Sequence, residues 1–215
     1  VVVTSVLFAA LAAVMLYRNG CMRTQLDFTN IKRLFIVSFP LIFYGLSGMI
    51  IFLSDRLFID KMVGKHAVGI YATAVSIASV VHFVKDALMK TVNPHQYEHL
   101  NSKDPNGKLL FVRQFYLVSA GLVLVAGLVT IVGTYMTTAV LNERYRGCTA
   151  FIGWLAFGFA INGMYGLLVP VAVYKSHSRN LAIIMAFGAV LNLGANYLLI
   201  KRFGAIGAAQ ATAFA

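Results

Sequence analysis

From Ser54 to Tyr71 the chain reads SDRLFIDKMVGKHAVGIY, a short charged segment between two long apolar runs. Two apolar runs around a charged turn indicate two membrane-spanning helices joined by a short loop. Asp55 and Arg56 follow directly on the first run. Ionisable residues at membrane depth are costly, so this pair predicts a functional site, and the two side chains are expected to neutralise one another in part.

The composition extends this interpretation to all 215 residues. Hydrophobic residues make up 60% of the chain and charged residues 12%, and the mean hydropathy is +0.79. Soluble domains carry about 25% charged residues, so a soluble fold is excluded. Several apolar runs approach the ~20 residues needed to cross a bilayer. We therefore predict an all-α fold, a polytopic transmembrane helical bundle.

Basic residues outnumber acidic ones by 18 to 7, which gives a net charge of +11. The excess fits the positive-inside rule, and it also suits attraction of an anionic, membrane-bound substrate. The distribution of lysine and arginine between alternate loops places residues 18–33, 90–108 and 175–179 in the cytoplasm. Nucleic-acid binding is not expected, because no soluble domain carries a basic patch.

We expect seven apolar segments, divided into the end of one helix (1–17), a cytoplasmic linker (18–33) and a truncated bundle (34–215). The chain begins inside an apolar run without Met and stops within a helix, so we expect a fragment of a longer protein. Pro40 marks a joint in the second segment. The third segment is expected to end near Leu88, with Pro94 opening a short turn.

The third segment carries a polar face. Ser79, His82, Asp86 and Lys90 recur at three- and four-residue steps, with Lys85 beside them. We expect this face to line the bundle interior or a water-filled cavity near the cytoplasmic end. Alternatively, the two lysines extend to the lipid head groups while the aspartate pairs with one of them.

Two other helical patterns point inward. Tyr44 and Asp55 share one face of the second segment. Asn192 and Asn196, four residues apart, are predicted to form hydrogen bonds to a neighbouring helix, with a ligand role as the alternative. The glycines of Gly45-x-x-Gly48 and of Gly204-x-x-Gly207 are expected to allow close helix packing.

One catalytic pattern matches. His95-Gln96-Tyr97-Glu98-His99 is His-x-x-Glu-His, in which two histidines bind zinc on one helical face. The match lies in a short charged linker with no domain to enclose a metal, and the later Glu143 falls on the opposite side of the membrane. We predict neither a metal site, nor a cofactor, nor catalysis here.

Two blocks resemble a known family. Phe39-Pro40-Leu41, Ser54–Ile59 and Val68–Tyr71 resemble the seventh and eighth helices of Wzx-type polysaccharide flippases, which belong to the MOP exporter superfamily. A second block, Asn192 to Ile200 followed by Gly204 to Thr212, resembles the eleventh-to-twelfth helix signature of the superfamily. Together the blocks cover nearly the whole chain.

The resemblance implies a MATE/MOP-like fold of roughly twelve helices in two lobes, of which about seven fall in this chain. It implies a transporter, not an enzyme, in the bacterial inner membrane. The cargo would be undecaprenyl-pyrophosphate-linked oligosaccharide, an O-antigen or capsule repeat unit, carried to the periplasmic leaflet. Implied partners are this substrate, membrane lipids, and polysaccharide polymerase or chain-length proteins.

Residue chemistry and resemblance together suggest a cationic cavity that holds the pyrophosphate, while ion coupling drives rocking of the lobes. The residues expected to bind substrate are Tyr44, Arg56, Lys85 and Lys90. Those expected to couple transport to an ion gradient, by titration or by binding a cation, are Asp55, His82 and Asp86. The rival functions are a multidrug or lipid II exporter of the same superfamily, a lipid-linked sugar polymerase with a large periplasmic loop, and a structural scaffold.

Overall fold

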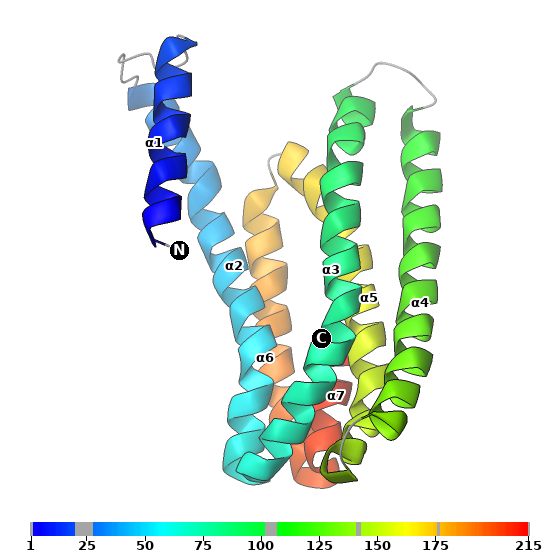
Figure 1. Ribbon diagram of the computed structural model, residues 1–215. Coiled ribbons are helices and arrows are strands. Elements are labelled where there is room, and N and C mark those ends of the chain that lie inside the picture. The colour runs from blue at the N-terminus through cyan, green and yellow to red at the C-terminus, as the bar shows by residue number, and fades with distance from the viewer. Residues whose placement is uncertain (1, 20–27, 102–106, 141–142, 176, 215) are drawn as a thin grey trace. The chain divides into compact units, whose positions relative to one another are not determined.

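A computed structural model describes residues 2–19, 28–101, 107–140, 143–175 and 177–214 (Figure 1). Within these ranges the secondary structure is helical, without strands, which confirms the predicted all-α class. The elements are α1 (Val2–Arg18), α2 (Phe28–Met62), α3 (Lys65–Asn101), α4 (Gly107–Ala139), the 3-10 helix η1 (Glu143–Cys148), α5 (Thr149–Tyr174), α6 (Ser178–Phe203) and α7 (Ala205–Phe214).

Five of the helices are long and apolar enough to cross a membrane, the mark of a multi-pass membrane protein. These candidate spans are Leu34–Met62, Lys65–Glu98, Gly107–Ala139, Tyr145–Tyr174 and Ser178–Phe203. A shorter apolar helix covers Thr4–Arg18.

The chain divides into two compact units, Val1–Ile36 and Val37–Ala215. The first unit contains α1 and the beginning of α2. Half of the predicted linker, residues 20–27, lies outside the described residues, and α2 begins at Phe28 within it. The predicted division into two lobes stays a prediction.

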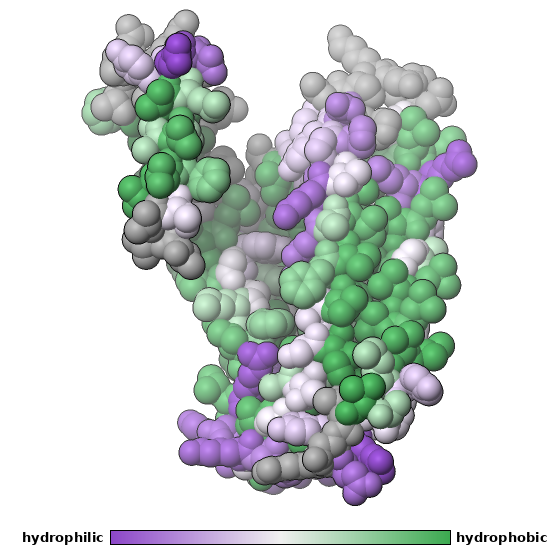
Figure 2. All heavy atoms as spheres, viewed as in Figure 1, coloured by the Kyte–Doolittle hydropathy of each residue, from purple (hydrophilic) through white to green (hydrophobic). Residues whose placement is uncertain are grey.

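In the second unit, α3, α4, α5 and α7 pack around a core that is rich in alanine (Figure 1). Small side chains let helix backbones approach closely. Helices in lipid depend on such close packing, because the lipid is as apolar as their side chains and no hydrophobic force drives them together. Apolar side chains cover the outward face of α4, as Figure 2 shows, and Leu117, Leu124 and Leu128 of this helix are each more than half exposed. The core members from these helices include Ala74, Ala78, Leu122, Ala126, Ala156, Ala160, Ala208 and Ala209.

The expected end of the third helix near Leu88 is wrong, because α3 continues to Asn101 with Pro94 inside it. A proline removes one backbone hydrogen bond but does not by itself prevent the chain from resuming the helix. Here Val92 and Gln96, on either side of the proline, are buried at 7% and 0% exposure. Packing of these side chains holds the helix together across the break.

The turn between α6 and α7 depends on glycine. Gly204 has φ 66° and ψ −149°, a backbone conformation that is essentially restricted to glycine. A Cβ atom added to Gly207 would overlap the backbone carbonyl of Leu199. The second pair of glycines therefore serves a tight turn between consecutive helices, with α7 folded closely onto the end of α6.

Candidate functional site

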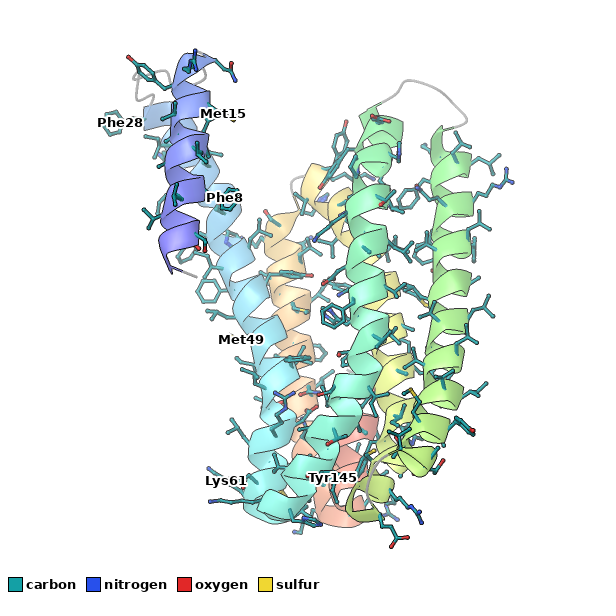
Figure 3. The ribbon with its side chains drawn as sticks, in the orientation of Figure 1. Phe8, Met15, Phe28, Met49, Lys61 and Tyr145 are labelled. Carbon is teal, nitrogen blue, oxygen red and sulfur yellow. The ribbon has the colours of Figure 1, made fainter. Side chains whose placement is uncertain are left out.

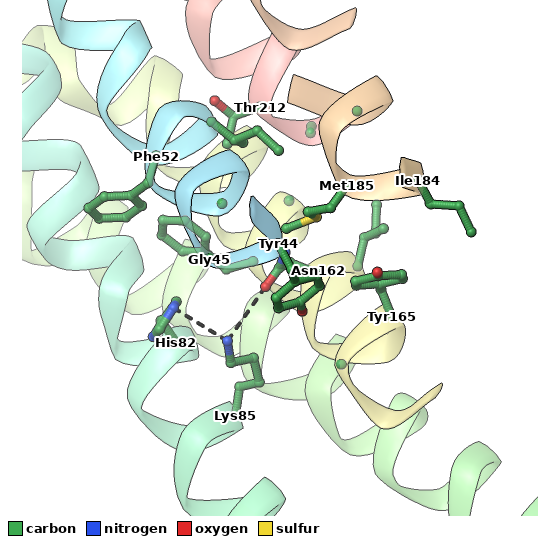
Figure 4. Close-up of a pocket in the computed structure, with 18 residues that line it drawn as sticks. Tyr44, Gly45, Phe52, His82, Lys85, Asn162, Tyr165, Ile184, Met185 and Thr212 are labelled. Carbon is green, nitrogen blue, oxygen red and sulfur yellow. Dashed lines mark hydrogen bonds between the residues drawn. The ribbon is translucent and has the colours of Figure 1, made fainter. Parts of the chain in front are cut away.

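A cavity of about 490 Å³ lies among α2, α3, α5, α6 and α7, entirely within the second unit (Figure 4). This volume falls in the range of ~300–1,000 Å³ that is usual for small-molecule sites. Aromatic and apolar side chains form most of the wall, and four other side chains add polar atoms. The apolar and aromatic members include Tyr44, Phe52, Phe159, Tyr165, Ile184 and Met185, and the polar ones are His82, Lys85, Asn162 and Thr212.

Glycines make room for the cavity. Gly45 lies on its wall, and a Cβ atom added there would meet no atom within 4 Å. The expectation of close helix packing is therefore wrong for Gly45, which borders open space. Gly48 is nearer to a neighbour, since its added Cβ would lie 3.4 Å from Met185 of α6.

Lys85 brings a cation into the cavity. Its side chain is 13% exposed, and its stem passes α5 at Gly163, where an added Cβ would lie 3.0 Å from the lysine Cγ. The ammonium group lies 3.3 Å from Asp86 Oδ1. It also reaches His82 Nε2 at 3.3 Å and Asn162 Oδ1 at 3.5 Å (Figure 4). All three contacts are longer than the usual 2.9–3.0 Å, so the lysine is held loosely.

His82, Lys85 and Asp86 form one connected group, as the helical spacing predicted. His82 Nδ1 lies 3.3 Å from Asp86 Oδ2. The imidazole packs edge to face against the Phe159 ring, with the two ring centroids 5.9 Å apart. The Asp86 side chain is 48% exposed. With a neutral histidine, the lysine and aspartate charges cancel, so the group becomes cationic only when the aspartate is neutralised or turns away.

Lys90 and Arg56 lie apart from this group. Lys90 is exposed and does not line the cavity. Arg56 is half-buried, and its guanidinium lies 5.6 Å from the centroid of the Phe52 ring. Among the described side chains no direct ion pair joins Arg56 to Asp55, so the attraction between the two charges acts at longer range than a contact.

Asp55 is buried, with 3% exposure, about 10 Å from the end of α2. Its carboxylate accepts three short hydrogen bonds from three different helices. Tyr71 of α3 and Thr212 of α7 each donate a hydroxyl to Oδ2 at 2.6 Å, and Asn196 of α6 donates its amide to Oδ1 at 2.8 Å. Hydrogen bonds to an ionised acceptor are short and strong, and here they stabilise the buried carboxylate.

The two asparagines of α6 extend this network, which confirms the predicted hydrogen bonds to a neighbouring helix. Ser54 donates to Asn192 Oδ1 at 3.0 Å, and the Asn196 amide also reaches Asn192 Oδ1 at 3.0 Å. Both asparagines are fully buried. Together with Asp55 they form a polar network that connects α2 to α6.

The structure separates Tyr44 from Asp55, which the sequence placed on one inward face. Tyr44 lines the cavity, whereas Asp55 does not. Thr212 connects the two places, because it lines the cavity and donates to Asp55. The sequence offered no sign of this connection, although Thr212 ends the Gly204–Thr212 block. Tyr71, Asn162 and Tyr165 were also missed; an isolated amide in an apolar helix was the available signal for Asn162.

The His-x-x-Glu-His pattern lies on the continuation of α3, not in a linker. His95 and Glu98 are exposed and 3.4 Å apart, while Gln96 between them is fully buried. The side chain of His99 lies outside the described residues. Elsewhere in the described part of the chain, no three His, Cys, Asp or Glu side chains gather as metal ligands would.

Comparisons with protein families, with curated proteins and with solved structures found no match to this chain.

Proposed function

We propose that this chain is part of an exporter that moves a lipid-linked oligosaccharide across the bacterial inner membrane, driven by an ion gradient. The observation that carries the proposal is the loosely held lysine in an aromatic-lined cavity between spanning helices. A cation at membrane depth is expensive, and such residues mark substrate or ion pathways. The resemblance of the Asp55–Arg56 block to Wzx-type flippases supports the same substrate class.

The cavity has the chemistry to receive a pyrophosphate and its sugars. A phosphate oxygen would offer Lys85 a shorter, charge-assisted hydrogen bond than its present contacts of 3.3–3.5 Å. Asp86 is half-exposed and can turn toward solvent. The buried Tyr165 hydroxyl has no hydrogen-bond partner among the described residues, a need that a sugar hydroxyl would meet.

Asp55 is the residue we assign to ion coupling. A threonine hydroxyl carries one hydrogen, and Thr212 Oγ1 has two acceptors within reach, Asp55 at 2.6 Å and the Ala208 carbonyl at 3.1 Å. When a proton or another cation neutralises Asp55, the threonine hydrogen turns to the carbonyl. Its oxygen then faces Asp55 as an acceptor, so the carboxyl group can change charge without leaving this hydroxyl unpaired.

The runner-up is another exporter of the same superfamily, for drugs or for lipid II, which would share the fold and differ in cargo. A polymerase is less favoured because it needs a large loop for its catalytic residues. The connections between consecutive helices are short, the longest being residues 19–27.

Transport of a lipid-linked oligosaccharide by the full-length protein in proteoliposomes tests the proposal. Lys85→Ala should raise the half-saturating substrate concentration about 10- to 100-fold, the value of one charge-assisted hydrogen bond. Lys61→Ala is the matched control, since Lys61 is exposed at the end of α2 and points away from the helices in Figure 3. Equal transport by both variants would refute the cationic cavity.

A further inference from the structure

A second hollow, of about 410 Å³, lies between α2 and α6 and is separate from the cavity. Aromatic and aliphatic side chains form its walls, and a single charged residue, Arg179, lies at its rim. Ala182 and Ala186, one turn apart on α6, give it a shallow floor. The other lining residues are Phe39, Pro40, Phe43 and Ile183.

Among the described side chains, Arg179 forms no ion pair. The chain contains no Asp or Glu after Glu143, and none between residues 34 and 54, the part of α2 that forms the opposite wall. Arg179 is exposed in the first turn of α6, and Lys175, which is also exposed, caps the preceding helix. Arg179 is therefore the single charge among residues that are otherwise apolar and line the groove.

We propose that this groove binds an anionic phospholipid of the surrounding bilayer, with one acyl chain between α2 and α6 and the phosphate on Arg179. An acyl chain suits walls of phenylalanine, proline, isoleucine and alanine. The guanidinium matches a phosphate in shape and charge, and it can form two parallel hydrogen bonds to it. Basic sites between spanning helices recognise anionic head groups in this way.

The test is photochemical cross-linking of the full-length protein in vesicles of phosphatidylcholine with a minor fraction of phosphatidylglycerol. p-Benzoylphenylalanine replaces Ile183 in the groove or, as the control, Leu124, which is 69% exposed on α4 and does not line the groove. Mass spectrometry counts the adducts of each lipid. At position 183 phosphatidylglycerol should be enriched about fivefold over its share of the vesicle, and at position 124 not at all.

Arg179→Gln should abolish the enrichment at position 183, and Arg179→Lys, which keeps the charge, should retain most of it. An adduct ratio equal to the vesicle composition at both positions would overturn the proposal, because the groove would then hold ordinary bilayer lipid. Adducts to protein instead of lipid would overturn it as well, since a segment of this protein or a second copy would fill the groove.

Discussion

Loss of the three hydrogen bonds to Asp55 determines how much the free energy of unfolding falls when the carboxylate is removed. Asp55→Ala takes an acceptor from Tyr71, Thr212 and Asn196. Thr212 retains a backbone acceptor at 3.1 Å, and Asn196 retains a side-chain acceptor at 3.0 Å. The hydroxyl of Tyr71, a residue with 1% exposure, loses the carboxylate to which it donates and becomes a buried donor without that acceptor.

An orphaned buried donor costs about 1–3 kcal/mol, and the two weakened bonds add about 0.6 kcal/mol each at the mean value for helices in membranes. The free energy of unfolding should therefore fall by about 2–4 kcal/mol. For a chain of this length the melting temperature should drop by roughly 5–15 °C. Far-ultraviolet circular dichroism in detergent measures the change. Asp60→Ala, which alters an exposed carboxylate on the same helix, is the control and should have almost no effect.

A second substitution, Tyr71→Phe, tests whether Tyr71 and Asp55 are coupled. Tyr71→Phe alone should lower the melting temperature, because it removes one donor to Asp55. In the Asp55→Ala background the same change should raise the melting temperature, because it removes the orphaned hydroxyl. If Tyr71→Phe lowers the melting temperature equally in both backgrounds, the two groups are not coupled and the hydrogen-bond account of this site is wrong.

Other substitutions test the turn, the cavity and the coupling. Gly207→Ala should destabilise the fold by about 3 kcal/mol in thermal unfolding, because its Cβ overlaps a carbonyl of α6, while Gly194→Ala, whose Cβ meets no atom within 4 Å, should not destabilise it. Gly163→Ala should weaken transport several-fold by displacing the cavity lysine, whereas Gly166→Ala, on the same wall with open space around it, should not. Thr212→Val should abolish the dependence of transport on the ion gradient, and Thr212→Ser should retain it.

The sequence was sufficient for the all-α class and for helices long and apolar enough to cross a membrane. The cost of an ionisable group in lipid drew attention to Asp55 and Lys85 without any structural information. Helical spacing also grouped His82 with Lys85 and Asp86 correctly, because neighbours three and four residues apart on one helix meet whatever the tertiary fold.

Contacts between helices were harder to predict. Nothing in the sequence pairs Asp55 with Tyr71 and Thr212, because their distance in the chain says little about how helices cross. The end of α3 was missed for a related reason. Pro94 is a strong local signal for a break, but the burial of Gln96 overrides it, and burial is a property of the packed bundle.

Thr212 determines how the cavity and the buried carboxylate affect one another in the proposed exporter. Its hydroxyl has one hydrogen, so donation to Asp55 and donation to the Ala208 carbonyl exclude each other. A substrate that contacts Thr212 in the cavity must therefore favour one charge state of Asp55 over the other. Linkage makes this reciprocal: an ion that neutralises Asp55 changes the affinity for substrate by the same factor by which substrate changes the affinity for the ion. Removing the hydroxyl should make the two affinities independent while both sites remain occupied, and this separates a coupling residue from one that merely supports the fold.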